Sequence, residues 1–154
     1  MLIDDLDIST DGKVDKRHLQ RMAMVQALFI DEFPGQSWHD VDWDYDKEQL
    51  AAIRQRKDDY DQEIARIATE RPLSELSRVD LAILRLMLHE SKTKDTPVKV
   101  LIDEGVELAK DFGGENSYAF INAVLEKMLL TSDEKAKIKT KVKDKQTAAT
   151  SKEK

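Results

Sequence analysis

The feature that most constrains the fold is an uninterrupted apolar segment near the middle of the chain. Between Val79 and Leu88 the apolar side chains are so closely spaced that, in a helix, they cover almost the whole circumference. A helix on the protein surface would carry a one-sided apolar stripe instead. We therefore expect a helix from Arg78 to about Ser91 that other elements surround, with Ser77 as its N-cap.

A second helix with little polar surface is expected in the first part of the chain, from about Asp15 to Phe33. Asp15 is a suitable N-cap, and Pro34-Gly35 ends the helix. The stretch Met22–Ile30 is apolar except for Gln26. This pattern indicates that the first helix is the central helix of the fold.

Proline and glycine mark the ends of two further helices. The apolar spacing predicts one helix from Asp46 to Glu70, which ends at Arg71-Pro72 because the proline ring clashes with a continuing turn. Another is expected to begin at Thr96-Pro97, with a capping hydroxyl, and to end at Gly113-Gly114 in a left-handed cap.

The last core helix is expected to open at Asn116 or Ser117. The core side chains expected from these helices are Leu50, Ile53, Tyr60, Ile64, Ile67, Val100, Leu101, Val106, Leu108, Phe120, Ile121, Val124, Leu125 and Met128. No segment has the pattern of a strand, and five Gly and three Pro are too few for a β fold with many tight turns. The predicted fold class is all-α.

The two ends of the chain differ from its middle in composition. Residues 1–14 are acidic and are expected to be a disordered leader, and residues 131–154 are expected to be a lysine-rich flexible tail. Residues 15–130 are expected to form one helical domain. Within it, Trp38 and Trp43 are expected to hold the loop at 34–46 against the body.

Composition also narrows the class of protein. The chain has no cysteine, which excludes disulfides and thiolate zinc sites. No apolar run approaches the ~20 residues that cross a membrane, and the acidic start is unlike a secretory signal, so a cytoplasmic protein is expected. Because the net charge is −6, RNA binding would need a local cluster of basic residues.

The polar residues do not follow a pattern typical of a catalytic or metal site. His18, His39 and His89 lie on different segments without the spacing of metal ligands, so no metal site is predicted. The carboxylates Asp103 and Glu104 are interpreted as part of a solvated helix face. We expect no enzymatic activity and no cofactor.

Two charged features are each open to two interpretations. A basic cluster lies at the start of the first helix and consists of Lys13, Lys16, Arg17, His18 and Arg21. Arg17 and Arg21 share a helix face and could bind successive phosphates, or the cluster is simply solvated. Glu90 follows the apolar segment and either faces solvent or contacts a partner.

Three blocks of the sequence together resemble the NusB family. They are KRHLQRMAMVQALF at 16–29, SRVDLAILRLMLHE at 77–90 and TPVKVLIDEGVELAKDFGGENSYAFINAVLEKML at 96–129. The third is the most specific, because Val-Glu-Leu-Ala-Lys-x-Phe-Gly precedes Ser-x-x-Phe-Ile-Asn-x-Val-Leu. The resemblance covers roughly residues 16–130 and depends on the order and spacing of the blocks.

This resemblance implies a fold of two perpendicular three-helix bundles, with about six to seven helices and no catalysis. It implies a transcription antitermination factor that binds boxA, a single-stranded RNA element of nascent ribosomal RNA leaders. The implied protein partner is NusE, a small-subunit ribosomal protein, and the pair joins the antitermination complex on RNA polymerase. A homodimer is a second possible state, since some family members mask the partner surface in that way.

The resemblance also assigns roles to individual residues. The implied RNA-binding residues are Lys16, Arg17, His18, Arg21, Phe112, Asn116, Ser117, Tyr118 and Phe120. The implied partner-binding residues are Phe29, Arg85 and Glu90. Arginine binds phosphate and aromatic rings stack on unpaired bases, although Phe120 is also a candidate for the core.

Two departures from the family pattern affect the expected affinity. Family members often begin with a dense arginine run, which Leu19 and Gln20 interrupt here, and the usual glycine before Val-Leu is Ala123. We therefore expect weaker and more salt-sensitive RNA binding than in a typical member.

Two alternative functions remain open at this point. One is a structural partner or homodimer with little RNA binding. The other is a stand-alone relative of the RNA-binding domain of rRNA cytosine methyltransferases. The chain could not act as that enzyme by itself, because no cofactor-binding α/β segment is expected.

Overall fold

The computed structural model describes residues 15–33, 35 and 45–130, and these residues contain helices and no strand. The elements are α1 (Lys16–Ile30), α2 (Lys47–Gln55), α3 (Lys57–Ile67), the 3-10 turn η2 (Leu73–Glu75), α4 (Arg78–Thr93), α5 (Val98–Phe112) and α6 (Ser117–Leu129). The predicted all-α class is confirmed. The expected leader, the expected tail, Trp38 and Trp43 lie outside the described residues.

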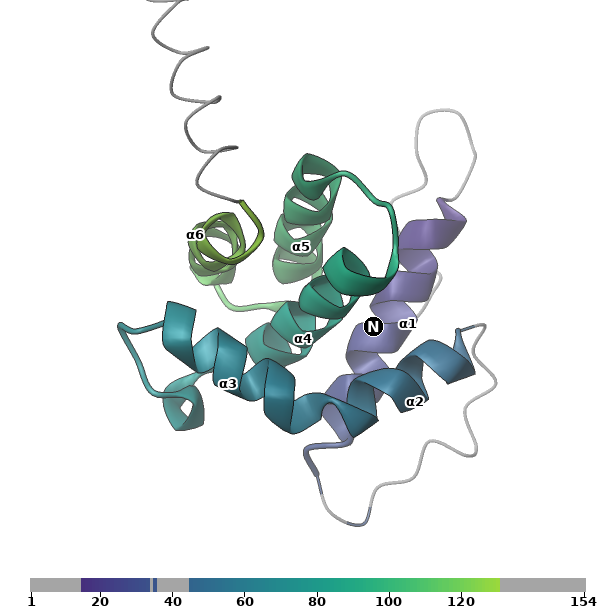
Figure 1. Ribbon diagram of the computed structural model, residues 1–154, viewed down its shortest axis with the longest axis horizontal. Helices are drawn as coiled ribbons and strands as arrows, with labels where there is room; N and C mark the ends of the chain where they lie inside the picture. Colours follow the sequence, from purple (N-terminus) through teal and green to yellow (C-terminus); the bar gives the residue numbers. More distant parts are fainter. Residues whose placement is uncertain (1–14, 34, 36–44, 131–154) are drawn as a thin grey trace, which may run out of the picture.

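α4 is the helix around which the others pack (Figure 1). Every side chain from Asp80 to Glu90 is buried, and α4 contacts each of the other five α-helices. The prediction that this segment is surrounded is confirmed. In the part of the chain that the structure describes, no helix is long and apolar enough to span a bilayer.

α1 is not the central helix, so that prediction was wrong. Its apolar stretch packs against α4, α2 and α5, but Ala23 and Gln26 stay partly exposed. α1 also ends at Ile30 rather than at Phe33. The chain there tightens into i→i+3 hydrogen bonds, in which the N–H of Glu32 donates to Phe29 and the N–H of Phe33 donates to Ile30.

α2 and α3 replace the single helix that was predicted from Asp46 to Glu70. The break lies at Arg56, whose backbone (φ −102°, ψ 10°) leaves the helical region. It allows α2 to pack on α1 and α4 while α3 packs on α4 and α6. Ile53 and Tyr60 are buried on either side of the break. The prediction failed because tertiary packing overrode a sequence that contains no helix-breaking residue at this point.

Most helix starts follow the expected capping chemistry. Asp15 and Ser77 cap α1 and α4 as predicted, each by accepting a 3.0 Å hydrogen bond from a backbone N–H of the first turn. Asp46 caps α2 in the same way. α5 differs, because it begins at Val98 without a side-chain cap, so the predicted role of Thr96 was wrong.

Most of the expected core is buried, but α5 turns one apolar face outward. Leu101 and Leu108 are buried, but Val100 is 43% exposed and Val106 is half-buried. These two valines were predicted to be core residues. The prediction was wrong because α5 packs on α4 and α6 with its opposite side. Ile67, Phe120 and Met128 are partly buried at the edge of the core.

Glycine is needed at position 113, where α5 ends, because a side chain would not fit there. It is not needed for a left-handed backbone conformation. Its φ of −84° is not left-handed, so the predicted left-handed cap was wrong. A Cβ atom on Gly113 would lie 2.4 Å from Ser117 Cβ and 2.6 Å from the carbonyl oxygen of Ala109. Glycine therefore allows the start of α6 to approach the end of α5 closely.

Gly113→Ala is expected to destabilise the protein by about 1–3 kcal/mol, because the backbone must shift to admit the methyl group. Urea denaturation measures the change in the free energy of unfolding. Gly114→Ala is the matched control, since a Cβ at that position would be 3.9 Å from Ser117 Oγ. The control should leave stability unchanged or slightly raised, and an equal loss in both variants would contradict the steric explanation.

Candidate nucleic-acid interface

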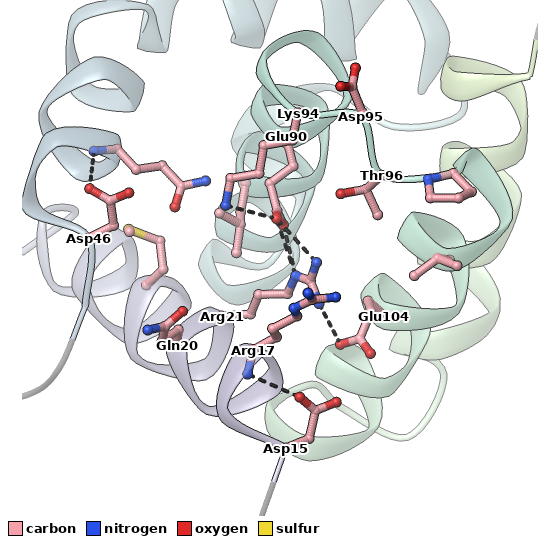
Figure 2. Close-up of a pocket in the computed structure, with 15 residues that line it drawn as sticks. Asp15, Arg17, Gln20, Arg21, Asp46, Glu90, Lys94, Asp95, Thr96 and Glu104 are labelled. Carbon is pink, nitrogen blue, oxygen red and sulfur yellow. Dashed lines mark hydrogen bonds and ion pairs between the residues drawn. The ribbon is translucent and has the colours of Figure 1, made fainter.

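Lys16 and Arg17 present positive charge at the start of α1. Both residues are exposed, and within the described residues neither side chain forms an ion pair. The backbone N–H of Arg17 donates to Asp15, which fixes the first turn of the helix. Figure 2 shows Arg17 and Arg21 pointing from α1 in the same direction, towards Glu90.

Glu90 is the most deeply buried charge of the region, and cations surround it. Its side chain is 2% exposed, and both of its carboxylate oxygens accept hydrogen bonds from Arg21, the shortest at 3.0 Å. Lys94 Nζ lies 3.5 Å from Glu90, and Arg21 Nη1 lies 3.4 Å from Glu104. A carboxylate at this depth requires such partners. Arg21, expected to bind RNA, is therefore engaged inside the protein.

His18 continues this series of charges from α1 to α5. Its Nδ1 is 2.9 Å from Glu104 and its Nε2 is 2.8 Å from Asp111. Because each ring nitrogen faces a carboxylate oxygen, both must carry a proton. The hydrogen bond to Glu104 and the second one to Asp111 outweigh burial and raise the pKa of His18 to about 9. The same contact lowers the pKa of Glu104.

A cavity of about 650 Å³ lies between α1, the start of α2, the end of α4 and the start of α5. The residues that line it are Asp15, Arg17, Gln20, Arg21, Met24, Asp46, Gln49, Leu86, Glu90, Lys94, Asp95, Thr96, Pro97, Val100 and Glu104. Its volume falls within the range of ~300–1,000 Å³ that is typical of ligand sites.

The start of α6 carries the other residues that were expected to bind RNA. Tyr118 is 46% exposed, and Lys110 Nζ lies 5.9 Å from the centre of its ring. Phe120 is partly buried, with the guanidinium of Arg71 at 5.1 Å from its ring centre. Each ring thus has a cation over one of its faces, at a distance that fits a cation–π interaction. Asn116 is exposed at the N-cap of α6.

Two of the expected RNA-binding residues lie deeper. Ser117 is buried, and its Oγ accepts a 3.0 Å hydrogen bond from the backbone N–H of Gly114. Phe112 is partly buried against the core. The hydrogen bond of Ser117 holds the turn between α5 and α6. The ion pair of His18 with Asp111, which adjoins Phe112 in the sequence, ties α1 to this turn.

The three expected partner-binding residues differ in exposure. Phe29 is half-buried and packs edge-on against Phe33 at 5.0 Å between ring centres. Arg85 is 3% exposed, donates to both carboxylate oxygens of Asp61 at 2.7 and 2.9 Å, and donates to Glu32 at 2.6 Å. Like Glu90, Arg85 therefore stabilises the interior and could affect a partner only through its neighbours.

Sequence reasoning did not identify the internal partners of these charges. Arg71, Asp61 and Asp111 carried no signal, because nothing in the local sequence links them to the residues they contact. Lys94 could have been identified, since it follows Glu90 by four positions, at the C-cap of the same helix. Among the described residues no group of three potential ligands could hold a metal ion.

Comparison with known proteins assigns the family. The NusB family model matches residues 13–130, so this chain belongs to the NusB family. The transcription antitermination protein NusB of Edwardsiella ictaluri is 42% identical over 108 residues, 70% of this chain and 75% of that protein. NusB of Shewanella amazonensis is 33% identical over 131 residues, 76% of this chain and 97% of that protein.

A solved structure agrees with this assignment. T. maritima NusB superposes with a TM-score of 0.66 at 32% identity, covering 76% of this chain and 92% of that one. Members of the family act in transcription antitermination and are not enzymes.

His18→Gln is expected to remove a pH dependence of stability. In the wild type the pKa of His18 rises from 6.5 when unfolded to about 9 when folded. The resulting stabilisation is fully present below pH 6.5 and is lost as the pH approaches 9. Because the side chain is 24% exposed, we expect a loss of about 1–2 kcal/mol rather than the full linkage value. Urea unfolding at pH 6 to 9.5 measures it, and parallel curves for both proteins would contradict the assignment.

Proposed function

We propose that this protein binds boxA-type single-stranded RNA of nascent ribosomal RNA leaders, together with NusE, as part of the antitermination complex on RNA polymerase. Work on nascent transcripts would place it in the cytoplasm. The observation that carries the RNA-binding part is the pair of exposed cations at the start of α1. Within the described residues, Lys16 and Arg17 form no ion pair.

The distribution of charge explains how an anionic protein could bind RNA. The net charge of −6 gives no general attraction for a polynucleotide. His18 and Arg21 are paired with carboxylates of the protein itself, so they add little to an external field. Within the described part of the chain, Lys16 and Arg17 form no ion pair, so they are available to contact phosphates. Because these contacts are to phosphates, we expect binding that weakens steeply as salt is added.

The start of α6 could supply contacts to bases. Tyr118 is exposed, and Phe120 lies under the guanidinium of Arg71. The ion pair between His18 and Asp111 joins the first turns of α1 to the end of α5, from which α6 starts. A single strand could therefore pass from phosphate contacts on α1 to stacking contacts on α6.

An apolar surface for the protein partner is formed by Phe29 and Phe33. Phe29 is half-buried, and Phe33 beside it is 40% exposed. Arg78 lies with its guanidinium 5.1 Å from the ring centre of Phe33. Arg85 and Glu32 form the charged layer beneath this surface. We propose that NusE binds here, with Arg85 acting as a positioning residue and Phe29 making direct contact.

Replacing both Lys16 and Arg17 with Gln is expected to weaken binding to a boxA oligonucleotide and to make it less sensitive to salt. Each lost phosphate contact lowers the slope of log affinity against log salt concentration by about 0.7 for a single strand. Fluorescence anisotropy over a range of salt concentrations measures both quantities. The matched control is Arg66→Gln with Lys127→Gln, two exposed cations on α3 and α6. Equal effects in both double variants would rule out a local site.

A gel-shift experiment with and without NusE separates the proposed function from a purely structural role. We expect a shift of boxA RNA by the protein alone that becomes stronger when NusE is added. In the Phe29→Ala variant, NusE should no longer strengthen the RNA shift, because Phe29 lies on the NusE-binding surface in this proposal. The shift that the variant produces without NusE should be unchanged. Binding of NusE without any RNA shift would favour the structural alternative.

A further inference from the structure

We propose that the cavity beside α1 receives one unpaired base of the bound RNA, while the phosphate of that nucleotide contacts Arg17. This inference rests on the RNA-binding function proposed above and assigns a specific subsite to it. The occupant is a single nucleotide with its base turned away from its neighbours. Three observations support it, namely the pairing of four of the lining charges with one another, the apolar mouth and an unpartnered polar group.

Four of the charges that line the cavity neutralise one another inside it. Lys94, Glu90, Arg21 and Glu104 form a continuous series of ion pairs. A further charge entering the cavity would have to compete with these pairs, whereas a neutral group need not. The interior therefore favours an uncharged ligand such as a nucleic acid base.

Three more carboxylates line the cavity, namely Asp15, Asp46 and Asp95, so five acidic residues face three basic ones and the lining is net negative. Asp15 and Asp46 each accept a hydrogen bond from the first turn of a helix, where a negative charge is stabilised. Arg17 then remains as the cation of the lining that has no ion pair within the described residues, and it points towards Glu90 in Figure 2. A neutral base inside and a phosphate at Arg17 match this distribution.

One side of the cavity is apolar and open. Val100 is 43% exposed, on the outward face of α5, and lines the cavity with Pro97 and the buried Met24 and Leu86. An exposed valine has no role in the core of the protein. Its methyl groups offer an apolar contact to the face of a base, and the guanidinium planes of Arg17 and Arg21 are also able to stack on bases.

A polar group of the lining lacks a partner. Gln49 Nε2 on α2 is buried, and no atom of the described chain accepts a hydrogen bond from it. A buried amide donor without an acceptor costs free energy. A carbonyl oxygen or ring nitrogen of a base would accept this hydrogen bond, so Gln49 is assigned to reading an acceptor on the base edge.

The test uses a variant in which a larger side chain fills the cavity. Its binding is measured with a series of boxA oligonucleotides, in each of which a different nucleotide lacks its base. Val100→Trp should weaken binding of the intact boxA oligonucleotide roughly tenfold, by occupying the space of the base. The substitution should not change the affinity for the one RNA that lacks the base proposed to enter the cavity. Ala51→Trp, at an exposed position of α2 outside the lining, is the control and should change nothing.

Gln49→Leu provides a second, independent variant, with Gln55→Leu at an exposed position of the same helix as its control. Gln49→Leu should weaken binding about three- to tenfold for the intact RNA. It should have no effect on the same abasic RNA that is insensitive to Val100→Trp. Thermal unfolding of all four variants checks that the fold is retained.

The possible results separate this inference from the function on which it rests. One result is that the RNA binds but Val100→Trp weakens the binding of every abasic RNA equally, or of none of them. The proposed base subsite is then wrong, while the RNA-binding function stands. If the cavity variants weaken only the binding of NusE, the cavity receives a protein side chain and the inference is wrong. If no RNA binds to any of the proteins, both proposals fail.

Discussion

The structure depends on the pairing of a carboxylate that the fold buries completely. Glu90 lies at the end of the apolar face of α4, and a charge at such a depth is strongly destabilising unless a cation accompanies it. Arg21 meets this requirement and thereby fixes α1 against α4. Since Arg21 also contacts Glu104, and Glu104 holds His18, the same series of charges positions α5. The relative position of three helices thus follows from one buried charge.

This requirement divides the basic residues of α1 between structure and surface. His18 and Arg21 belong to the interior, while Lys16 and Arg17 stay exposed. A count of basic residues in the sequence would overestimate the charge available to RNA. The same division leaves a cavity in which Arg21, Lys94, Glu90 and Glu104 neutralise one another, while Arg17 forms no ion pair within the described residues. An RNA could be held there by contacts to one base as well as by its phosphates.

The sequence predicted correctly the features that depend on residues close together in the chain. It predicted less well the features that depend on contacts between helices. The buried character of α4 and the caps at Asp15 and Ser77 followed from periodicity and capping chemistry. The break at Arg56 and the exposure of Val100 did not, because both result from how neighbouring helices pack. For the candidate site, the basic cluster and the aromatic residues of α6 were identified, but the cavity between α1, α2, α4 and α5 was not.

What the sequence determined by itself is the all-α class, the position of most helix boundaries and membership in the NusB family, because these depend on patterns over a few residues or on the order of characteristic blocks. Only the tertiary structure decided which charges are available to a ligand. Arg21 is 69 positions from Glu90, and His18 is 93 positions from Asp111. An ion pair over such separations exists only after the helices have packed, so no local pattern encodes it.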